Sequence, residues 1–290
     1  MRVLRNTALS VLSPTFVGAD GETPTDTAST PTAAVSREDG TSLSALTVTA
    51  SSVSDGVYSA ALTTTHTSQL DRLKVTWGGT AGSLAQSYVT ELEVVGAHLV
   101  SITEMRDERG LDNTTSVPLA LLRRVRDKWS QQIEDACGVA FSPRYERDVL
   151  RGNGKSVLLL SKIRPLSLIA VTIDGVSQTL TNFSLHDSGA IEYEGSTFPR
   201  PSGAGPNVVV TYEHGFPSCP EDIRHELLKA IRQEVHRYSK DLPTDAISQA
   251  FPDGPTIRYS TPGPDRPTGI LSFDALLASP AYRFRPPAVG

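Results

Sequence analysis

The sequence predicts an α+β protein: an N-terminal β-sandwich, then a small domain of helices and a β-meander, then an extended Pro-rich C-terminal arm. Short, partly alternating apolar runs separated by turn residues fill the first 100 residues, a pattern typical of a sandwich. Two amphipathic helical patterns then flank a second group of short β-type runs. Nine of the twenty prolines lie in residues 241–290. The predicted boundaries follow these changes of pattern and are 1–100, 101–241 and 242–290. A chain of this length holds about two domains, and the arm is the third segment.

The N-terminal region is expected to form strands within residues 41–50, 56–63, 70–77 and 88–96. Asp55-Gly56 and Gly78-Gly79 are the expected turns between them. Residues 22–34 are polar and contain proline, so we expect a loop there.

Helices are expected near residues 102–109, 116–137 and 220–240. In the second of these, Ser116 can cap the N-terminus, Pro118 suits the first turn and Gly138 can end the helix. Its apolar residues recur at three- and four-residue steps, which predicts one buried stripe: Leu122, Val125, Trp129, Ile133 and Ala136. The third helix has a similar stripe: Ile223, Leu227, Ile231, Val235 and Tyr238.

Residues 144–215 read as a compact β-meander in which Asp174-Gly175 is a strong tight-turn signal. This region contains Gly154-Lys155-Ser156, the last part of a phosphate-binding loop pattern. Such a loop needs another glycine where this chain has Val149, and it opens a helix, whereas "SVLLL" predicts a strand. We therefore interpret "RGNG" as a hairpin turn with positive-φ residues and Lys155 as a solvated side chain.

The sequence offers no constellation that argues for an enzyme, a cofactor or a metal site. Cys137 and Cys219 are far apart and lack CxxC spacing, so we expect two buried thiols in a reducing compartment. His225 and His236 share a helix face, but the helical rise separates them by about 16 Å, too far to share a metal. The run that contains His214 has neither a nucleophile elbow nor a glycine-rich oxyanion loop.

Charge is distributed unevenly along the chain. The net charge is −5, which does not favour nucleic-acid binding by the whole molecule. No apolar run approaches the roughly 18 residues of a membrane span, so no membrane association is expected. A basic cluster on the second helix is interpreted as a solvated surface, or as subunit-interface or lumen charges: Arg123, Arg124, Arg126 and Lys128.

The order of features between residues 101 and 241 resembles the head–tail connector (head-to-tail adaptor) family of long-tailed bacteriophages. A short helix, "ITEMRDERG", precedes a Trp-containing helix that ends "IEDACGVAF". The strand "YERDVLRGNGKSVLLL" leads to "IRPLSLIAVTIDG", and "FSLHDSGAIEYEG" is similar to a short hairpin of the family. "NVVVTYEHGFPSCPEDIRHELLKAIRQEV" looks like its passage into a long helix, although Leu227 or Leu228 departs from the small residues common there. The resemblance covers about half the chain.

The resemblance implies a structural virion protein at the neck, made in the host cytoplasm. It implies a ring, usually of twelve copies, that docks on the portal, seats the stopper or another tail-neck protein, and passes genomic DNA through its lumen without sequence-specific binding. The first 100 residues look like an added immunoglobulin-like sandwich. The C-terminal arm is then suited to binding a neighbouring subunit or the portal. Its expected anchors are Phe273, Leu276, Leu277, Tyr282 and Phe284.

Two alternatives remain at this point. A secreted or surface-exposed adhesion protein would use the Ser/Thr-rich β half to bind a glycan or a protein, but it needs an export signal and the first residues offer a poor one. A nucleotide-dependent enzyme would rest on Gly154-Lys155-Ser156 alone.

Overall fold

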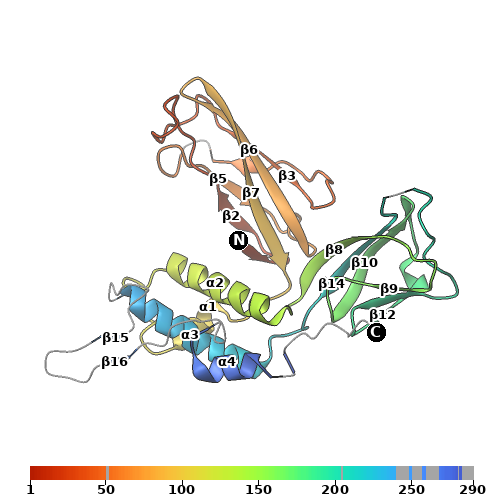
Figure 1. The fold of residues 1–290 in the computed structure, drawn as a ribbon. Helices are drawn as coiled ribbons and strands as arrows, with labels where there is room; N and C mark the ends of the chain where they lie inside the picture. The colour runs from red at the N-terminus through yellow and green to blue at the C-terminus, as the bar shows by residue number, and fades with distance from the viewer. Residues whose placement is uncertain are drawn as a thin grey trace.

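The computed structural model describes residues 1–49, 52–203, 205–239, 248–249, 257–258, 268–279 and 281–282. Strands and helices are both abundant, which confirms the predicted α+β class. In Figure 1 the N-terminal β unit (residues 1–95) lies at the top, the helices lie below it, and the β-meander (residues 144–214) lies to the right.

The N-terminal β unit consists of two sheets around one apolar core. One sheet has the order β1-β7-β6-β3 and the other β2-β5-β4. The side chains of Phe16, Leu73 and Trp77 are fully buried between the sheets. The strands are β1 (Arg2–Leu4), β2 (Leu9–Leu12), β3 (Thr32–Ser36), β4 (Thr47–Val48), β5 (Ser59–Leu62), β6 (Asp71–Ala81) and β7 (Leu84–Val95).

One predicted turn in this unit is wrong. Gly78-Gly79 lies inside β6, and the chain reverses three residues later at Gly82-Ser83, where both residues have positive φ. A Cβ atom on Gly79 would lie 2.9 Å from the methyl group of Thr27, so glycine there makes room for the loop packed on the strand. Close packing, and not a turn, explains the glycine.

The helical layer contains α1 (Ile102–Asp107), α2 (Leu119–Cys137), α3 (Glu221–Ser239) and α4 (Leu271–Leu277). Ser101 and Glu104 form a capping box at the start of α1. At α2 the N-cap is Pro118, whereas Ser116 donates its backbone N–H to the Asn113 side chain and does not cap the helix. The predicted C-cap is correct, because Gly138 is left-handed and its N–H bonds the Glu134 carbonyl.

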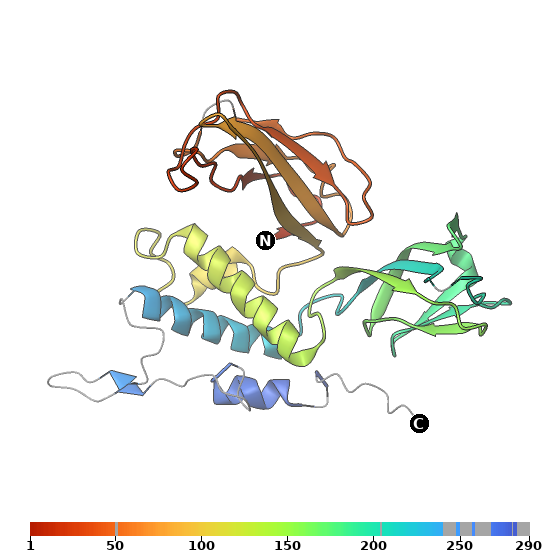
Figure 2. The ribbon, with the colours of Figure 1, turned by 45° about the horizontal axis from the view of Figure 1, so that its top comes forward.

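Helix α2 is buried on two sides. Figure 2 shows it between the N-terminal β unit above and α3 and α4 below. Leu122, Val125 and Ile133 of the predicted stripe face the helical core, together with Leu227 and Val235 of α3. A second row on α2 is also buried although it is polar: Arg126, Ser130 and Glu134. This polar row lies beside the apolar stripe on the helix surface and was not predicted.

The β-meander consists of two sheets, β11-β10-β14-β8 and β12-β13-β9. Their inner faces enclose Val171, Ile191 and Val210. Asp174 and Gly175 both have positive φ in the β10–β11 turn, as predicted for a tight hairpin. The elements are β8 (Arg144–Leu150), β9 (Val157–Leu159), β10 (Pro165–Ile173), β11 (Val176–Ser177), the 3-10 turn η1 (Leu180–Asn182), β12 (Phe183–His186), β13 (Ala190–Tyr193) and β14 (Val208–His214).

The "RGNG" segment does not form the predicted hairpin. It joins β8 to β9, which belong to different sheets, and only Gly154 in it has positive φ. A Cβ on Gly152 would lie 1.9 Å from the carbonyl oxygen of Pro199, so this glycine permits two loops to touch. The segment is therefore a crossing between the two sheets.

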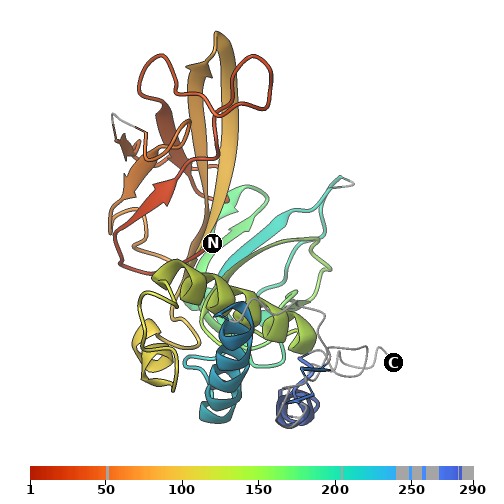
Figure 3. The same cartoon turned by 90° about the vertical axis from the view of Figure 1, so that its left-hand side faces the viewer.

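Helix α4 packs against the helical layer of its own chain. Figure 3 shows it, in dark blue, beside α3. Between α3 and α4 the described residues include one short pair of strands, β15 (Ser248–Gln249) and β16 (Ile257–Arg258). Within the described residues, no helix has the length and apolar character needed to cross a membrane.

Candidate functional site

Four charged side chains form a closed ring of ion pairs where the N-terminal β unit meets α2 and β8. Glu134 binds Arg2 at 2.7 Å and Arg144 at 2.8 Å, and Glu93 binds the same two arginines at 3.6 and 2.8 Å. The arginine and Glu134 side chains are at most 9% exposed. Two positive and two negative charges thus compensate one another in a buried place, which we call the charged quartet.

Four elements place these groups together. The strand pairing sets Arg2 of β1 directly beside Glu93 of β7. Glu134 is one turn before the C-cap of α2, and Arg144 begins β8 directly after the connection that follows α2. Glu134 also accepts a hydrogen bond from the Phe141 backbone N–H at 3.1 Å. Burial acts to raise the pKa of the Glu134 carboxyl, while Arg144 and Arg2 act to lower it.

The region where the N-terminal β unit meets α2, β8 and β14 is called the joint below. Further contacts hold it together around the quartet. Arg5 pairs with Glu213 of β14 at 3.2 Å, and Arg72 of β6 pairs with Glu146 of β8 at 3.1 Å. Tyr145 of β8 is 3% exposed and belongs to the apolar core of the N-terminal β unit. The joint is therefore held by one inserted aromatic ring and by ion pairs from three strands of the β unit.

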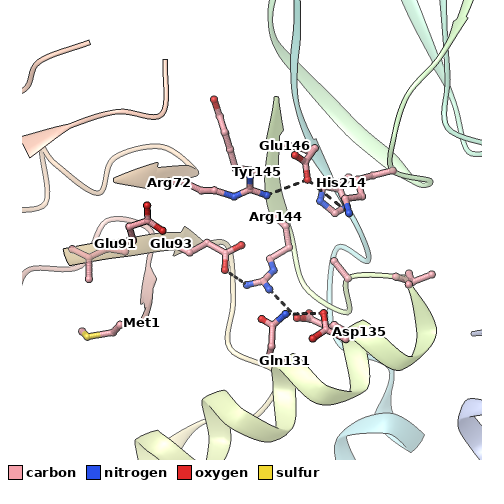
Figure 4. Close-up of a pocket in the computed structure, with 16 residues that line it drawn as sticks. Met1, Arg72, Glu91, Glu93, Gln131, Asp135, Arg144, Tyr145, Glu146 and His214 are labelled. Atoms are coloured by element: carbon pink, nitrogen blue, oxygen red, sulfur yellow. Dashed lines mark hydrogen bonds and ion pairs between the residues drawn. The ribbon is translucent and has the colours of Figure 1, made fainter. Parts of the chain in front are cut away.

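A cavity of about 600 Å³ opens beside the quartet (Figure 4). Its walls come from β6, β7, β8, α2 and the end of β14, where His214 is buried. Burial is the main cause that lowers the pKa of His214 to about 3, and the nearby cations Lys162, Arg144 and Arg72 contribute to this shift. His214 is thus neutral at neutral pH.

The link between the β unit and α1 (residues 96–101) carries a second histidine of this kind. Burial lowers the pKa of His98 to about 4, with Arg126 as the next cause. Arg126 is 5% exposed and bonds the adjacent Asp127 at 3.0 Å. Both histidines at the joint therefore lie near arginines.

The four basic residues predicted as a surface cluster on α2 have different environments. Arg126 is buried at the joint, so its assignment as a lumen or subunit-interface charge is wrong. Lys128 binds Glu234 of α3 at 2.7 Å, and the Arg124 guanidinium stacks over the Tyr238 ring at 5.3 Å. Arg123 is exposed. The four residues are close in the sequence, but their side chains lie on more than one side of the helix.

The predicted arm anchors pack within the chain itself. Phe273 is fully buried and Leu277 is 5% exposed in the helical core, and Leu276 and Tyr282 pack against that core. The Tyr282 hydroxyl donates to the Asp222 carboxylate at 2.8 Å. Phe284 lies outside the described residues. The other four predicted anchors thus belong to the helical core or pack against it.

The Gly154-Lys155-Ser156 segment uses its backbone groups internally. The Gly154 N–H donates to the Phe198 carbonyl at 2.8 Å, and the Lys155 N–H donates to the Asn153 side chain at 2.8 Å. These amides are therefore not free to cradle a phosphate. The interpretation of this segment as a connection, and not as a nucleotide loop, rests on these bonds.

One Ser–His pair was missed in the sequence. The Ser44 hydroxyl lies 2.9 Å from Nε2 of His66 inside the N-terminal β unit. Nδ1 of His66 accepts the Thr63 backbone N–H at 3.1 Å, so Nε2 carries the proton and faces Ser44 as a donor. The imidazole therefore offers Ser44 no base, and the pair ties two loops together.

Both cysteine thiols have raised pKa values because of burial, about 11 for Cys137 and about 12 for Cys219. Cys137 is buried as predicted, whereas Cys219 is half-buried. Across the residues that the structure describes, no group of three or more His, Cys, Asp or Glu side chains is placed to hold a metal ion. No protein-family model matches the chain, and a search of curated proteins finds no significant match.

Proposed function

We propose that this protein is a structural, non-catalytic component of a virion: a head-to-tail adaptor that forms a ring between the portal and the stopper of a long-tailed phage. DNA would pass through the lumen of the ring. The N-terminal β unit would be an added immunoglobulin-like sandwich fixed to each subunit. A ring of the family's usual twelve copies is the expected assembly.

The observation that carries the proposal is the order of elements between residues 101 and 241. Short helix α1, long helix α2, the β-meander and long helix α3 follow one another as the resemblance implies. Helices α2 and α3 share one apolar core, and the meander projects from the end of this helical pair. This arrangement supports an adaptor.

The charge distribution is compatible with passage of DNA. The net charge of −5 gives a ring of many copies no general attraction for phosphates, which otherwise dominates nucleic-acid affinity. The C-terminal segment would contribute contacts to a neighbouring subunit or the portal through residues beyond α4.

Electron microscopy and native mass spectrometry test the proposal directly. The purified protein is mixed with the portal of the phage that encodes it, and we expect rings with a mass near twelve times the 31.1 kDa of one chain. The same density should appear at the neck of the virion. Absence of ring density at the neck, with the protein found instead on a cell surface, would favour the adhesion alternative.

A further inference from the structure

We propose that the cavity at the joint is a binding site for a single carboxylate group, with Lys162 and His214 as its contacts. The carboxylate would belong to an acidic side chain of a docking protein or to a small free acid. The site is separate from ring formation and does not depend on the proposed function.

The first observation is a buried histidine without a polar partner. His214 is 6% exposed and lines the cavity. Among the residues that the structure describes, its imidazole makes no hydrogen bond or ion pair. The His214 nitrogens are not among the enclosed unpaired atoms of the described residues, so they face the open cavity, where a ligand can reach them.

The second observation is the sign of the charges around this imidazole. After burial, the charged groups that contribute to its lowered pKa are all cations: Lys162, Arg144 and Arg72. The Lys162 side chain is 43% exposed, and its ion pair with Glu146 spans 3.9 Å. A loosely held ammonium group beside an unpaired imidazole suits an anionic oxygen.

The carboxylates in the walls limit the charge of the ligand. Glu93 and Glu134 are occupied by the quartet arginines, and Glu146 is shared by Arg72 and Lys162. Glu91 and Asp135 also line the cavity and form no ion pair in the described structure. Figure 4 shows Met1 and Glu91 on the side opposite His214. With so many carboxylates nearby, a group with one negative charge fits better than a phosphate dianion or a nucleic acid.

Binding should be linked to proton uptake. A carboxylate beside His214 stabilises the imidazolium form, so it raises the pKa of His214 from its low value. By reciprocity, acidification must then strengthen carboxylate binding. Over the range in which one proton is taken up, the affinity rises by up to roughly tenfold per pH unit.

NMR titration of the full chain tests the site. Sodium acetate is titrated against sodium chloride at constant ionic strength, at pH 7 and pH 5, while the ring resonances of His214 are followed. We expect saturable shifts that are specific to acetate, tighter binding at pH 5 and a higher pKa of His214 in acetate than in chloride. Identical behaviour in the two salts would overturn the proposal.

Variants and a peptide separate the contacts and the source of the carboxylate. Lys162→Gln, at a partly exposed position, should weaken acetate binding at least fivefold. Lys155→Gln, at an exposed position on the β8–β9 connection, should leave it unchanged. A capped Gly-Glu-Gly peptide that competes with acetate, when Gly-Gln-Gly does not, identifies an acidic side chain as a ligand. Acetate binding without peptide binding identifies a small acid, and equal binding to the two lysine variants contradicts the assigned contact.

Discussion

At the scale of single residues, Glu134 is a buried carboxylate that forms ion pairs with two arginines, Arg2 and Arg144. Replacing Glu134 by glutamine keeps the size of the side chain but removes the charge that compensates Arg2 and Arg144. Removal of one partner from a buried ion pair costs about 3–5 kcal/mol. We expect Glu134→Gln to lower the free energy of unfolding by about 3 kcal/mol, measured by urea denaturation at pH 7.

The neighbouring residue gives a matched control for this variant. Asp135 is exposed on the next position of α2 and accepts a hydrogen bond from Gln131. Asp135→Asn should change stability by less than about 0.5 kcal/mol. Equal effects of the two substitutions would mean that the quartet contributes nothing beyond the general charge of the helix.

His214 gives stability a pH dependence with a defined sign. Its folded pKa of about 3 lies below the ordinary value of 6.5, so the native state favours the neutral imidazole. The contribution of His214 is complete above pH 6.5 and is lost as the pH falls from 6.5 toward 3, because the unfolded chain then binds the extra proton. At pH 5 this loss is about 2 kcal/mol. His98 acts in the same direction.

Denaturation at several pH values measures this effect. The free energy of unfolding of the parent protein should fall between pH 6.5 and 5, and His214→Asn should reduce that slope even if its stability at pH 7 is lower. An unchanged slope in the variant would assign the acid sensitivity to other groups.

At the scale of elements, the turn between β14 and α3 is crowded. Gly215 has a φ of 107°, and a Cβ there would lie 2.7 Å from the Ser142 carbonyl oxygen and 2.8 Å from that of Ala140. Gly215→Ala should therefore lower stability by roughly 2–4 kcal/mol in thermal or urea unfolding. Gly195 also has positive φ but has no atom within 4 Å of its Cβ position. Gly195→Ala should cost only about 1 kcal/mol, and a similar cost at both positions would exclude crowding as the cause.

Helix α4 depends on one aromatic side chain for its position. Phe273 is fully buried against α2 and α3, whereas Leu271 of the same helix is 67% exposed. We expect Phe273→Ala to release α4 and to raise amide hydrogen exchange across residues 268–279 at least tenfold. Without the buried ring, the free energy needed to detach α4 from the core is lower. Leu271→Ala should leave exchange unchanged. Equal exchange in both variants would contradict the role of Phe273.

Periodicity predicted the long helices, because their apolar stripes face one continuous core. It did not predict that the polar row Arg126, Ser130 and Glu134 is buried, since charged residues outside an apolar stripe normally face solvent. Here the β unit covers that side of α2. The short strands β1, β2 and β3 also escaped prediction, because three to five residues carry too little alternation. Pairing with longer neighbours stabilises them.

At the scale of the whole molecule, the quartet was beyond prediction from the sequence. Its members lie at positions 2, 93, 134 and 144, and only the packing of four elements brings them together. The same holds for Tyr145, a strand residue of the meander whose ring completes the core of another unit. Local patterns therefore describe each unit, whereas the joint depends on contacts between units.

The joint fixes the N-terminal β unit to the rest of the chain, and Tyr145 supplies the most buried apolar side chain of that attachment, together with the partly buried Ile169 of β10. Tyr145→Ala should leave both units folded, as judged by circular dichroism, because each retains the rest of its own core. It should increase the radius of gyration in small-angle X-ray scattering and the hydrogen exchange of residues 96–100. Val149→Ala, four residues further along the same face of β8 and 49% exposed, should change neither. An unaltered radius of gyration in Tyr145→Ala would mean that the ion pairs alone hold the two units together.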